Sequence, residues 1–147
     1  MSVILALTGL GLMVGLSGTG SAIGLVIGGS AVIGMMKKTP DKFANGLILS
    51  ALPATQGLYG FVAFIMYNES MNANLTLFQG AVVFGAGLAL GLVTLVSAIQ
   101  QGKICAAGIS AIGSGHDVFG NTFILAAFPE FYAILSLVAA ILMRNLL

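Results

Sequence analysis

Four long apolar stretches, separated by three short polar clusters, make up the chain. The polar clusters lie at 37–42, 68–74 and 113–117, and the apolar stretches cover roughly 3–36, 43–67, 76–112 and 118–146. A helix needs roughly 20 apolar residues to cross the hydrocarbon core, so each stretch is long enough. The apolar runs are continuous, whereas a membrane β-strand alternates apolar and polar residues. The pattern predicts an all-α membrane protein with four transmembrane helices.

Composition excludes the main alternative classes. The chain has 147 residues, of which 59% are hydrophobic and 6% are charged, whereas a soluble domain carries about 25% charged residues. A soluble enzyme and a disordered chain are therefore poor interpretations. The net charge of +1 leaves no basic surface for nucleic acid. The single Cys105 lies in an apolar stretch and is interpreted as a small packing residue.

The basic residues predict the orientation of the chain in a cell membrane. Lys37, Lys38 and Lys42 lie in the first polar cluster and Lys103 lies towards the third, whereas the second cluster is acidic. The positive-inside rule therefore predicts that the loops between spans 1 and 2 and between spans 3 and 4 are cytoplasmic. Both termini of this multi-pass protein are then expected outside. Arg144, at the outer end, is interpreted as a side chain that snorkels.

The chain also contains an internal repeat with an offset of 76 residues and no gap. Matched positions include Gly11 and Gly87, Ser21 and Ser97, and a longer series ending with Pro53 and Pro129. The repeat predicts two tandem helical hairpins, 1–71 and 72–147, which have the same orientation in the membrane.

Glycines recur every four residues in the first stretch, at Gly20, Gly24 and Gly28. This spacing places small residues on one helix face and lets helix backbones approach closely. Stretches one and three are rich in glycine and stretches two and four are bulkier. The contrast predicts thin inner helices and larger outer helices, as in a closed ring.

Glu130 is the one acidic residue deep inside an apolar stretch. About 13 residues separate it from either end of that stretch, which is roughly 20 Å of helix. A charged carboxylate at this depth costs at least about 3 kcal/mol, so it must be protonated, paired or bound to a cation. Such a residue is a functional-site hypothesis by default.

Other polar residues are expected at the depth of Glu130. The second stretch carries four residues at i, i+3, i+4 and i+7, which share one helix face: Leu52, Thr55, Gln56 and Tyr59. The third stretch carries Gln100 and Gln101. Carbonyl, hydroxyl, amide and carboxylate oxygens are the ligands that hard cations prefer. The set favours a dehydrated cation such as Na⁺; alternatively, these side chains only hydrogen-bond one another across the helices.

The repeat relates two prolines near the candidate site. Pro53 and Pro129 are each predicted to kink a helix and to free the carbonyl group of Leu49 or Leu125. The position that matches Glu130 in the first hairpin is Ala54. The duplicated unit is therefore expected to carry one ion-binding carboxylate.

Several stretches together resemble a known family. They are residues 52–61 (LPATQGLYGF), 101–103 (QGK), 106–109 (AAGI) and 130–135 (EFYAIL). They resemble the sixteen-kilodalton proteolipid of V-type and A/V-type ATPases, the membrane rotor-ring component often called K or c, and most closely its sodium-translocating bacterial members. By motif, the resemblance implies that Na⁺ is bound by the Leu52 carbonyl, Thr55, Gln56, Gln101 and Glu130, with Tyr59 nearby.

The resemblance further implies a non-catalytic, ion-translocating subunit, with nucleotide hydrolysis in other subunits. About ten copies are expected to form a ring in lipid, each carrying a cation at Glu130 without an organic cofactor. The implied partners are a stator subunit with an essential arginine and a central stalk at the cytoplasmic loops.

Three alternatives remain open at this point. One is a ring that carries protons, with Gln56 and Gln101 only hydrogen-bonded to Glu130. Small four-helix multidrug transporters also use one membrane carboxylate, although the absence of Trp and the tandem duplication fit them poorly. The third alternative is a structural membrane scaffold in which Glu130 has no transport role.

Overall fold

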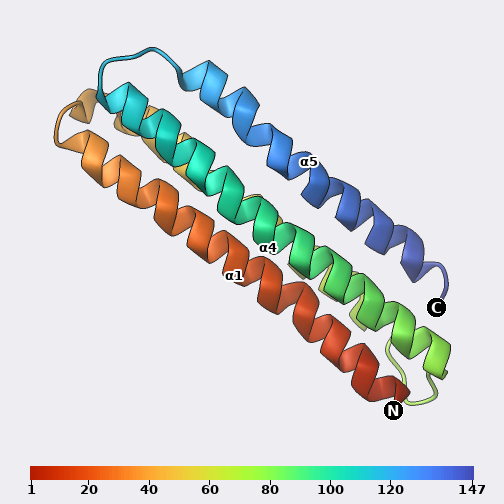
Figure 1. The fold of residues 1–147 in the computed structure, drawn as a ribbon. Coiled ribbons are helices and arrows are strands. Elements are labelled where there is room, and N and C mark those ends of the chain that lie inside the picture. The colour runs from red at the N-terminus through yellow and green to blue at the C-terminus, as the bar shows by residue number, and fades with distance from the viewer.

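The computed structural model describes residues 1–147 and is helical throughout (Figure 1). Its elements are α1 (Ser2–Met36), the short 3₁₀ helix η1 (Pro40–Lys42), α2 (Phe43–Ala51), α3 (Ala54–Asn68), α4 (Leu77–Gly113) and α5 (Phe119–Arg144). They form four helical spans that are long and apolar enough to cross a membrane, of which the second runs from Pro40 to Asn68. The predicted all-α, four-span architecture is confirmed.

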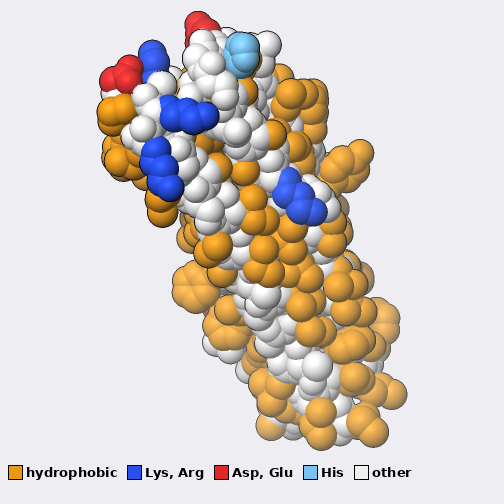
Figure 2. All heavy atoms as spheres, turned by 60° about the vertical axis from the view of Figure 1, so that its left-hand side comes forward, with side chains coloured by type: hydrophobic (Ala, Val, Ile, Leu, Met, Phe, Trp, Pro, Cys, Tyr) orange, Lys and Arg blue, Asp and Glu red, His pale blue; other side chains and the backbone are white.

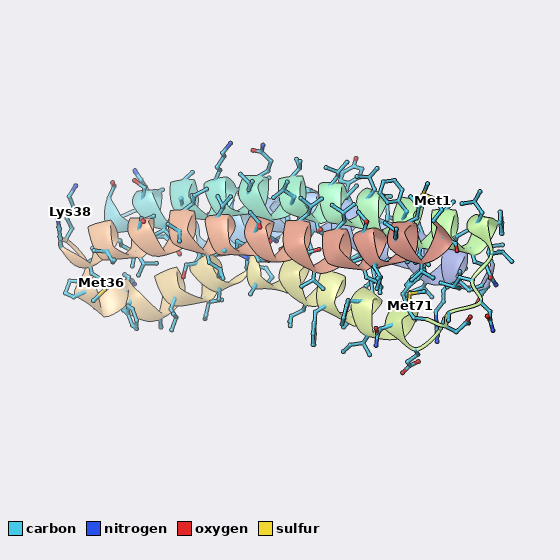
Figure 3. All side chains as sticks on the ribbon, turned by 90° about the horizontal axis from the view of Figure 1, so that it is seen from below. Met1, Met36, Lys38 and Met71 are labelled. Atoms are coloured by element: carbon cyan, nitrogen blue, oxygen red, sulfur yellow. The ribbon has the colours of Figure 1, made fainter.

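The helices lie side by side as two hairpins that point the same way. Both chain termini lie at one end of the bundle, and the connections after α1 and after α4 lie at the other (Figure 1). Met36 and Lys38 mark the connection end, and Met1 and Met71 mark the terminal end (Figure 3). The glycine-rich helices α1 and α4 make the most extensive contact in the molecule, while α3 and α5 pack against them.

Glycines permit this close contact between α1 and α4. A Cβ atom on Gly87 would lie 2.0 Å from the carbonyl oxygen of Gly9, and one on Gly102 would lie 2.6 Å from that of Gly24. Both distances are far below van der Waals contact, so no larger residue fits without separating the helices. Of the glycines spaced by four residues, Gly20 and Gly24 meet α4, whereas Gly28 meets Ser50 of α2.

Two apolar clusters flank a polar layer in the bundle. Leu90 of α4 belongs to the cluster nearer the termini, and Ile109 belongs to the cluster nearer the connections. Between these positions α4 buries Thr94, Ser97 and Gln101. Every buried side-chain nitrogen and oxygen in the chain has a hydrogen-bond partner. The polar layer therefore follows the rule that buried polar groups are hydrogen-bonded.

The two repeat-related prolines have different effects on their helices. The second span is interrupted at Leu52 and Pro53, which separate α2 from α3, whereas Pro129 lies inside an uninterrupted α5. The Leu49 carbonyl, which was expected to lose its helical partner, accepts the Leu52 N–H at 3.4 Å. The second span therefore breaks at Pro53, whereas α5 continues through Pro129, and the predicted kink at Pro129 stays a prediction.

Most charged residues lie near the two ends of the bundle; Lys103, inside α4, and Glu130, near the middle of α5, are the exceptions. Figure 2 shows basic, acidic and histidine side chains gathered at one end of the bundle, with one further basic side chain lying apart from them along the bundle. At the other end, Arg144 pairs with Glu69 at 3.2 Å. Arg144 therefore has an acidic partner, which the sequence analysis did not anticipate.

The contact between α1 and α4 can be tested with one glycine substitution. We expect Gly87→Val to lower the stability of the detergent-solubilised protein by about 3 kcal/mol or more, because the new side chain overlaps the α1 backbone. Thermal unfolding followed by circular dichroism measures the effect. Gly34→Val is the matched control, since a Cβ atom on Gly34 has no neighbour within 4 Å. Equal losses for both variants would contradict the tight contact.

Candidate functional site

Glu130 lies near the middle of α5 and is partly buried between helices. Its Oε1 accepts a hydrogen bond from the Tyr59 hydroxyl of α3 at 2.8 Å. Its Oε2 accepts a hydrogen bond from the Gln101 amide of α4 at 3.0 Å. Three helices therefore meet at this carboxylate.

Two glutamine side chains lie behind Glu130 and are fully buried, at 0% exposure. Gln56 Nε2 donates to Gln101 Oε1 at 2.9 Å. Gln101 Nε2 donates to the Ala126 carbonyl at 2.9 Å as well as to Glu130. The two amides form a continuous hydrogen-bonded path from α3 through α4 to α5.

Oxygen atoms cluster where α2 gives way to α3. Thr55 Oγ1 lies 3.1 Å from the Leu52 carbonyl oxygen and 3.2 Å from Gln56 Oε1. The interruption at Pro53 changes the backbone pattern, so that the Thr55 N–H also bonds to the Leu52 carbonyl at 3.2 Å. One turn of chain thus supplies carbonyl, hydroxyl and amide oxygens, which are ligands suited to a hard cation.

The charge of the site limits what it can hold. Glu130 is its single acidic group, and no group of three His, Cys, Asp or Glu residues suited to a metal occurs in the chain. One monovalent cation or one proton neutralises such a site, whereas a divalent cation would leave a net positive charge. Uncompensated charge in apolar surroundings is costly.

The structure brings all six predicted site residues into one hydrogen-bonded group: Leu52, Thr55, Gln56, Tyr59, Gln101 and Glu130. Gln100 is not among them, because it lies on an exposed face of α4. The Gln101 amide presents its nitrogen to Glu130 and its oxygen to Gln56. Ligation of a cation by the Gln101 oxygen therefore stays a prediction.

Ser97 also belongs to this group, and the sequence analysis missed it. Its hydroxyl is buried, donates to the Pro129 carbonyl at 2.8 Å and accepts from Gln56 Nε2 at 3.2 Å. The repeat carried the signal, because Ser21 donates in the same way to the Pro53 carbonyl at 2.6 Å. Ser21, however, accepts from the backbone N–H of Gly57 at 2.7 Å, not from a glutamine.

The sequence profile of the ATP synthase C-subunit family matches the chain twice, at residues 8–67 and 84–143. The two matches have the offset of the internal repeat, and each covers one helical hairpin. The boundary between hairpins at 71 and 72 stays a prediction, since it falls between the matched segments.

Curated relatives agree with the profile. The A-type ATP synthase subunit K of Methanocaldococcus jannaschii is 40% identical over 143 residues, covering 95% of this chain and 61% of the relative. The V-type sodium ATPase subunit K of Enterococcus hirae is 37% identical over 115 residues, covering 78% of this chain and 74% of the relative. The 16 kDa proteolipid of the human V-type proton ATPase is 22% identical over 117 residues, covering 80% and 76%.

The chain therefore spans 61% of the length of the archaeal relative, although nearly all of this chain is aligned. The profile accounts for most of its residues, in two copies that correspond to the two hairpins. With this double match and two relatives above 30% identity, the chain belongs to the ATP synthase C-subunit family.

Proposed function

We propose that the chain is the membrane rotor-ring subunit of a V-type or A-type ATPase and carries a cation at Glu130. The observation that supports this most directly is the hydrogen-bonded group that joins Glu130 to Tyr59, Gln101 and Gln56 inside an apolar bundle. An isolated carboxylate would be costly there, so its placement indicates a role. The names of the relatives, subunit K of an ATP synthase and of a sodium ATPase, point the same way.

In this proposal, each copy in a ring of about ten holds one cation near the middle of the membrane. The cation neutralises Glu130, so the site can face lipid at moderate cost. Gln56 and Gln101 are fully buried, whereas Glu130 is only partly buried. The carboxylate, unlike the two glutamines, is thus accessible to an arginine of a stator subunit. Ion release and rebinding then accompany rotation, and other subunits carry out the nucleotide chemistry.

We favour Na⁺ as the transported cation. The oxygens of Leu52, Thr55 and Gln56 lie close together and carry no charge, so with Glu130 they form a set of total charge −1. A proton carrier needs only the carboxyl group. The relative from Enterococcus hirae is a sodium ATPase subunit.

Proton transport is the second candidate. The Tyr59 hydroxyl lies 2.8 Å from Glu130 Oε1, within reach of a hydrogen bond from a neutral carboxyl group, while Gln101 donates to the other oxygen. The human relative is a proton ATPase subunit, although its identity is lower.

The basic end of the bundle is proposed to face the cytoplasm. Lys37, Lys38 and Lys42 lie at the connection after α1, close to the connection after α4, where Lys42, His116 and Asp117 line a common pocket of about 280 Å³. The positive-inside rule favours this orientation. Residues 37–42 and 113–117 would then be the surfaces available to a central stalk.

Carbodiimide labelling of the assembled ring tests the identity of the ion. The reagent modifies a protonated carboxyl group, so bound Na⁺ should slow the labelling of Glu130 at constant pH. We expect Gln56→Leu to raise the Na⁺ concentration for half-protection at least about tenfold, equivalent to about 1.4 kcal/mol. Choline at equal ionic strength serves as the control and should not slow the labelling of Glu130. If the rate of Glu130 labelling is the same at every Na⁺ concentration, the sodium proposal is wrong and proton transport is the remaining candidate.

Transport by the complete ATPase tests whether Glu130 carries the ion. We expect Glu130→Gln to reduce ATP-driven ion uptake into vesicles to background, because the amide has no charge to exchange. Glu69→Gln is the matched control; it removes an exposed ion pair with Arg144, which contributes only about 0–1 kcal/mol. Normal uptake with Glu130→Gln would favour the scaffold alternative.

Ser97 is expected to position Gln56 for the ion. A carbonyl only accepts, so the Ser97 hydroxyl must donate to Pro129 and present its lone pairs to Gln56 Nε2, which turns Gln56 Oε1 towards Thr55. We expect Ser97→Ala to weaken Na⁺ protection about fivefold, the equivalent of one hydrogen bond of about 1 kcal/mol.

Ser21→Ala is the matched control for this effect. It removes the equivalent bond to Pro53 without touching a glutamine, and should leave Na⁺ protection unchanged. Ser97→Thr, which keeps the hydroxyl, should restore protection. Equal losses in Ser97→Ala and Ser21→Ala would mean that both serines act only in helix packing.

A further inference from the structure

A groove of about 810 Å³ lies between α4 and α5, and most of its lining residues are apolar. Gln100 of α4 is one of the few polar residues in its wall. The side chain of Gln100 is exposed and takes part in none of the hydrogen bonds within the chain. An amide without a partner is unfavourable on a helix that spans a membrane. The amide of Gln100 therefore calls for an acceptor nearby.

The carbonyl group of Leu125, in the opposite wall, has lost its usual donor. In a helix the carbonyl of one residue accepts the N–H of the residue four positions later, and here that residue is Pro129, which has no N–H. Leu125 and Pro129 both line the groove, so the carbonyl, which points along α5 towards Pro129, lies at the groove wall. In membrane helices, carbonyls freed by proline are satisfied by neighbouring helices, by side chains, by water or by a local change of helix geometry.

The first hairpin satisfies the equivalent carbonyl by breaking its helix. The counterparts of Leu125 and Pro129 are Leu49 and Pro53. The Leu49 carbonyl accepts the N–H of Leu52 at 3.4 Å, and the second span is interrupted at this point. α5, in contrast, continues through its proline. The second hairpin therefore needs a donor from a side chain where the first hairpin uses a turn.

The internal repeat places Gln100 beside the proline. Its counterpart in the first hairpin is Gly24. A Cβ atom on Gly24 would lie 2.7 Å from the Cβ atom of Pro53, so this position of the repeat packs directly against the proline. The second hairpin thus carries an amide at the point where the first hairpin has no side chain.

The register of α4 against α5 agrees with this placement. Ser97 donates to the Pro129 carbonyl at 2.8 Å, and Gln101 Nε2 donates to the Ala126 carbonyl at 2.9 Å. Gln100 lies between these two donors along α4, so it is level with the stretch of α5 from Ala126 to Pro129. The freed carbonyl oxygen lies at this level, because a helical carbonyl points towards the following turn.

We propose that the Gln100 amide donates to the Leu125 carbonyl in the membrane, and that Gln100 is thereby a positioning residue for Glu130. Because the Gln100 side chain is exposed, it is free to turn into the groove. Gln100 and Gln101 then hold two consecutive carbonyls of α5, those of Leu125 and Ala126, about one turn before Glu130. This inference rests on the proposed function, since it concerns how the ion-carrying carboxylate is held.

Tyr132 carries the other side-chain donor of the groove that has no partner. Its side chain is 69% exposed and belongs to α5 itself. The aromatic ring is rigid and holds the hydroxyl group away from the backbone of its own helix, so it does not reach the Leu125 carbonyl. Gln100, which projects from the facing helix, is the better donor, and Tyr132 provides a control.

A double-substitution cycle tests the bond, with Na⁺ protection of Glu130 against carbodiimide in the assembled ring as the readout. We expect Gln100→Leu to raise the Na⁺ concentration for half-protection about fivefold, the equivalent of one hydrogen bond. Pro129→Ala returns an N–H to the Leu125 carbonyl, so Gln100→Leu should have no effect in that background. Tyr132→Phe should leave half-protection unchanged in both backgrounds.

Other roles of Gln100 give different results. If Gln100 only faced lipid, Gln100→Leu would leave protection unchanged or improve it, because leucine is the more favourable residue in lipid. That outcome, or an equal loss in both backgrounds, would overturn the proposal. A loss with Tyr132→Phe and none with Gln100→Leu would also overturn it, since Tyr132 would then be the donor.

Thermal unfolding of the solubilised variants separates failure of this inference from failure of the proposed function. If Na⁺ does not protect the unsubstituted ring, the proposed Na⁺ site is wrong, but the bond is still measured. Gln100→Leu should then lower Tm by roughly 3 °C when Pro129 is present and leave it unchanged with Pro129→Ala. Equal changes of Tm in both backgrounds would overturn the bond and leave the rotor.

Discussion

The structure depends on one constraint, the burial of a carboxylate among apolar helices. Glu130 cannot be left without partners there, and its two oxygens take hydrogen bonds from α3 and from α4. The glutamines that supply and support these bonds are themselves buried, so they need partners in turn and find them in each other, in Ser97 and in the Ala126 carbonyl. Satisfying one acidic group thus fixes the relative positions of three helices. The glycine contacts between α1 and α4 add a second constraint, which holds α4 closely against α1.

Duplication followed by divergence explains how the site arose from ordinary helix packing. Both hairpins retain a serine that donates to the carbonyl of a proline, so this bond belongs to the architecture. Only in the second hairpin does the serine also accept from a glutamine, and only there does an acidic residue follow the proline. Of these two repeat-related positions, one carries Glu130 and the proposed function. The other carries Ala54, which only packs.

Much of this could be predicted from the sequence, for definite reasons. The spans were predictable because the polar clusters are sharp and few polar residues lie between them, and Glu130 stood out as the single acid within a span. The different behaviour of Pro53 and Pro129 was not predictable, because it depends on neighbouring helices and not on the residue type. Ser97 was missed since a serine in an apolar helix has many ordinary roles. The direction of the Gln101 amide is likewise set by its tertiary partners, which the sequence does not display.

The presence of Ala54 at the position that matches Glu130 has a consequence for energy conversion. In the proposed rotor, each turn moves one cation for every four helices in the ring, half the number that would move if both hairpins were charged. The free energy of a given number of nucleotides is then divided among fewer ions. With fewer ions moved per nucleotide hydrolysed, each ion can be driven against a steeper electrochemical gradient. Synthesis of nucleotide by the reverse rotation requires a correspondingly larger gradient.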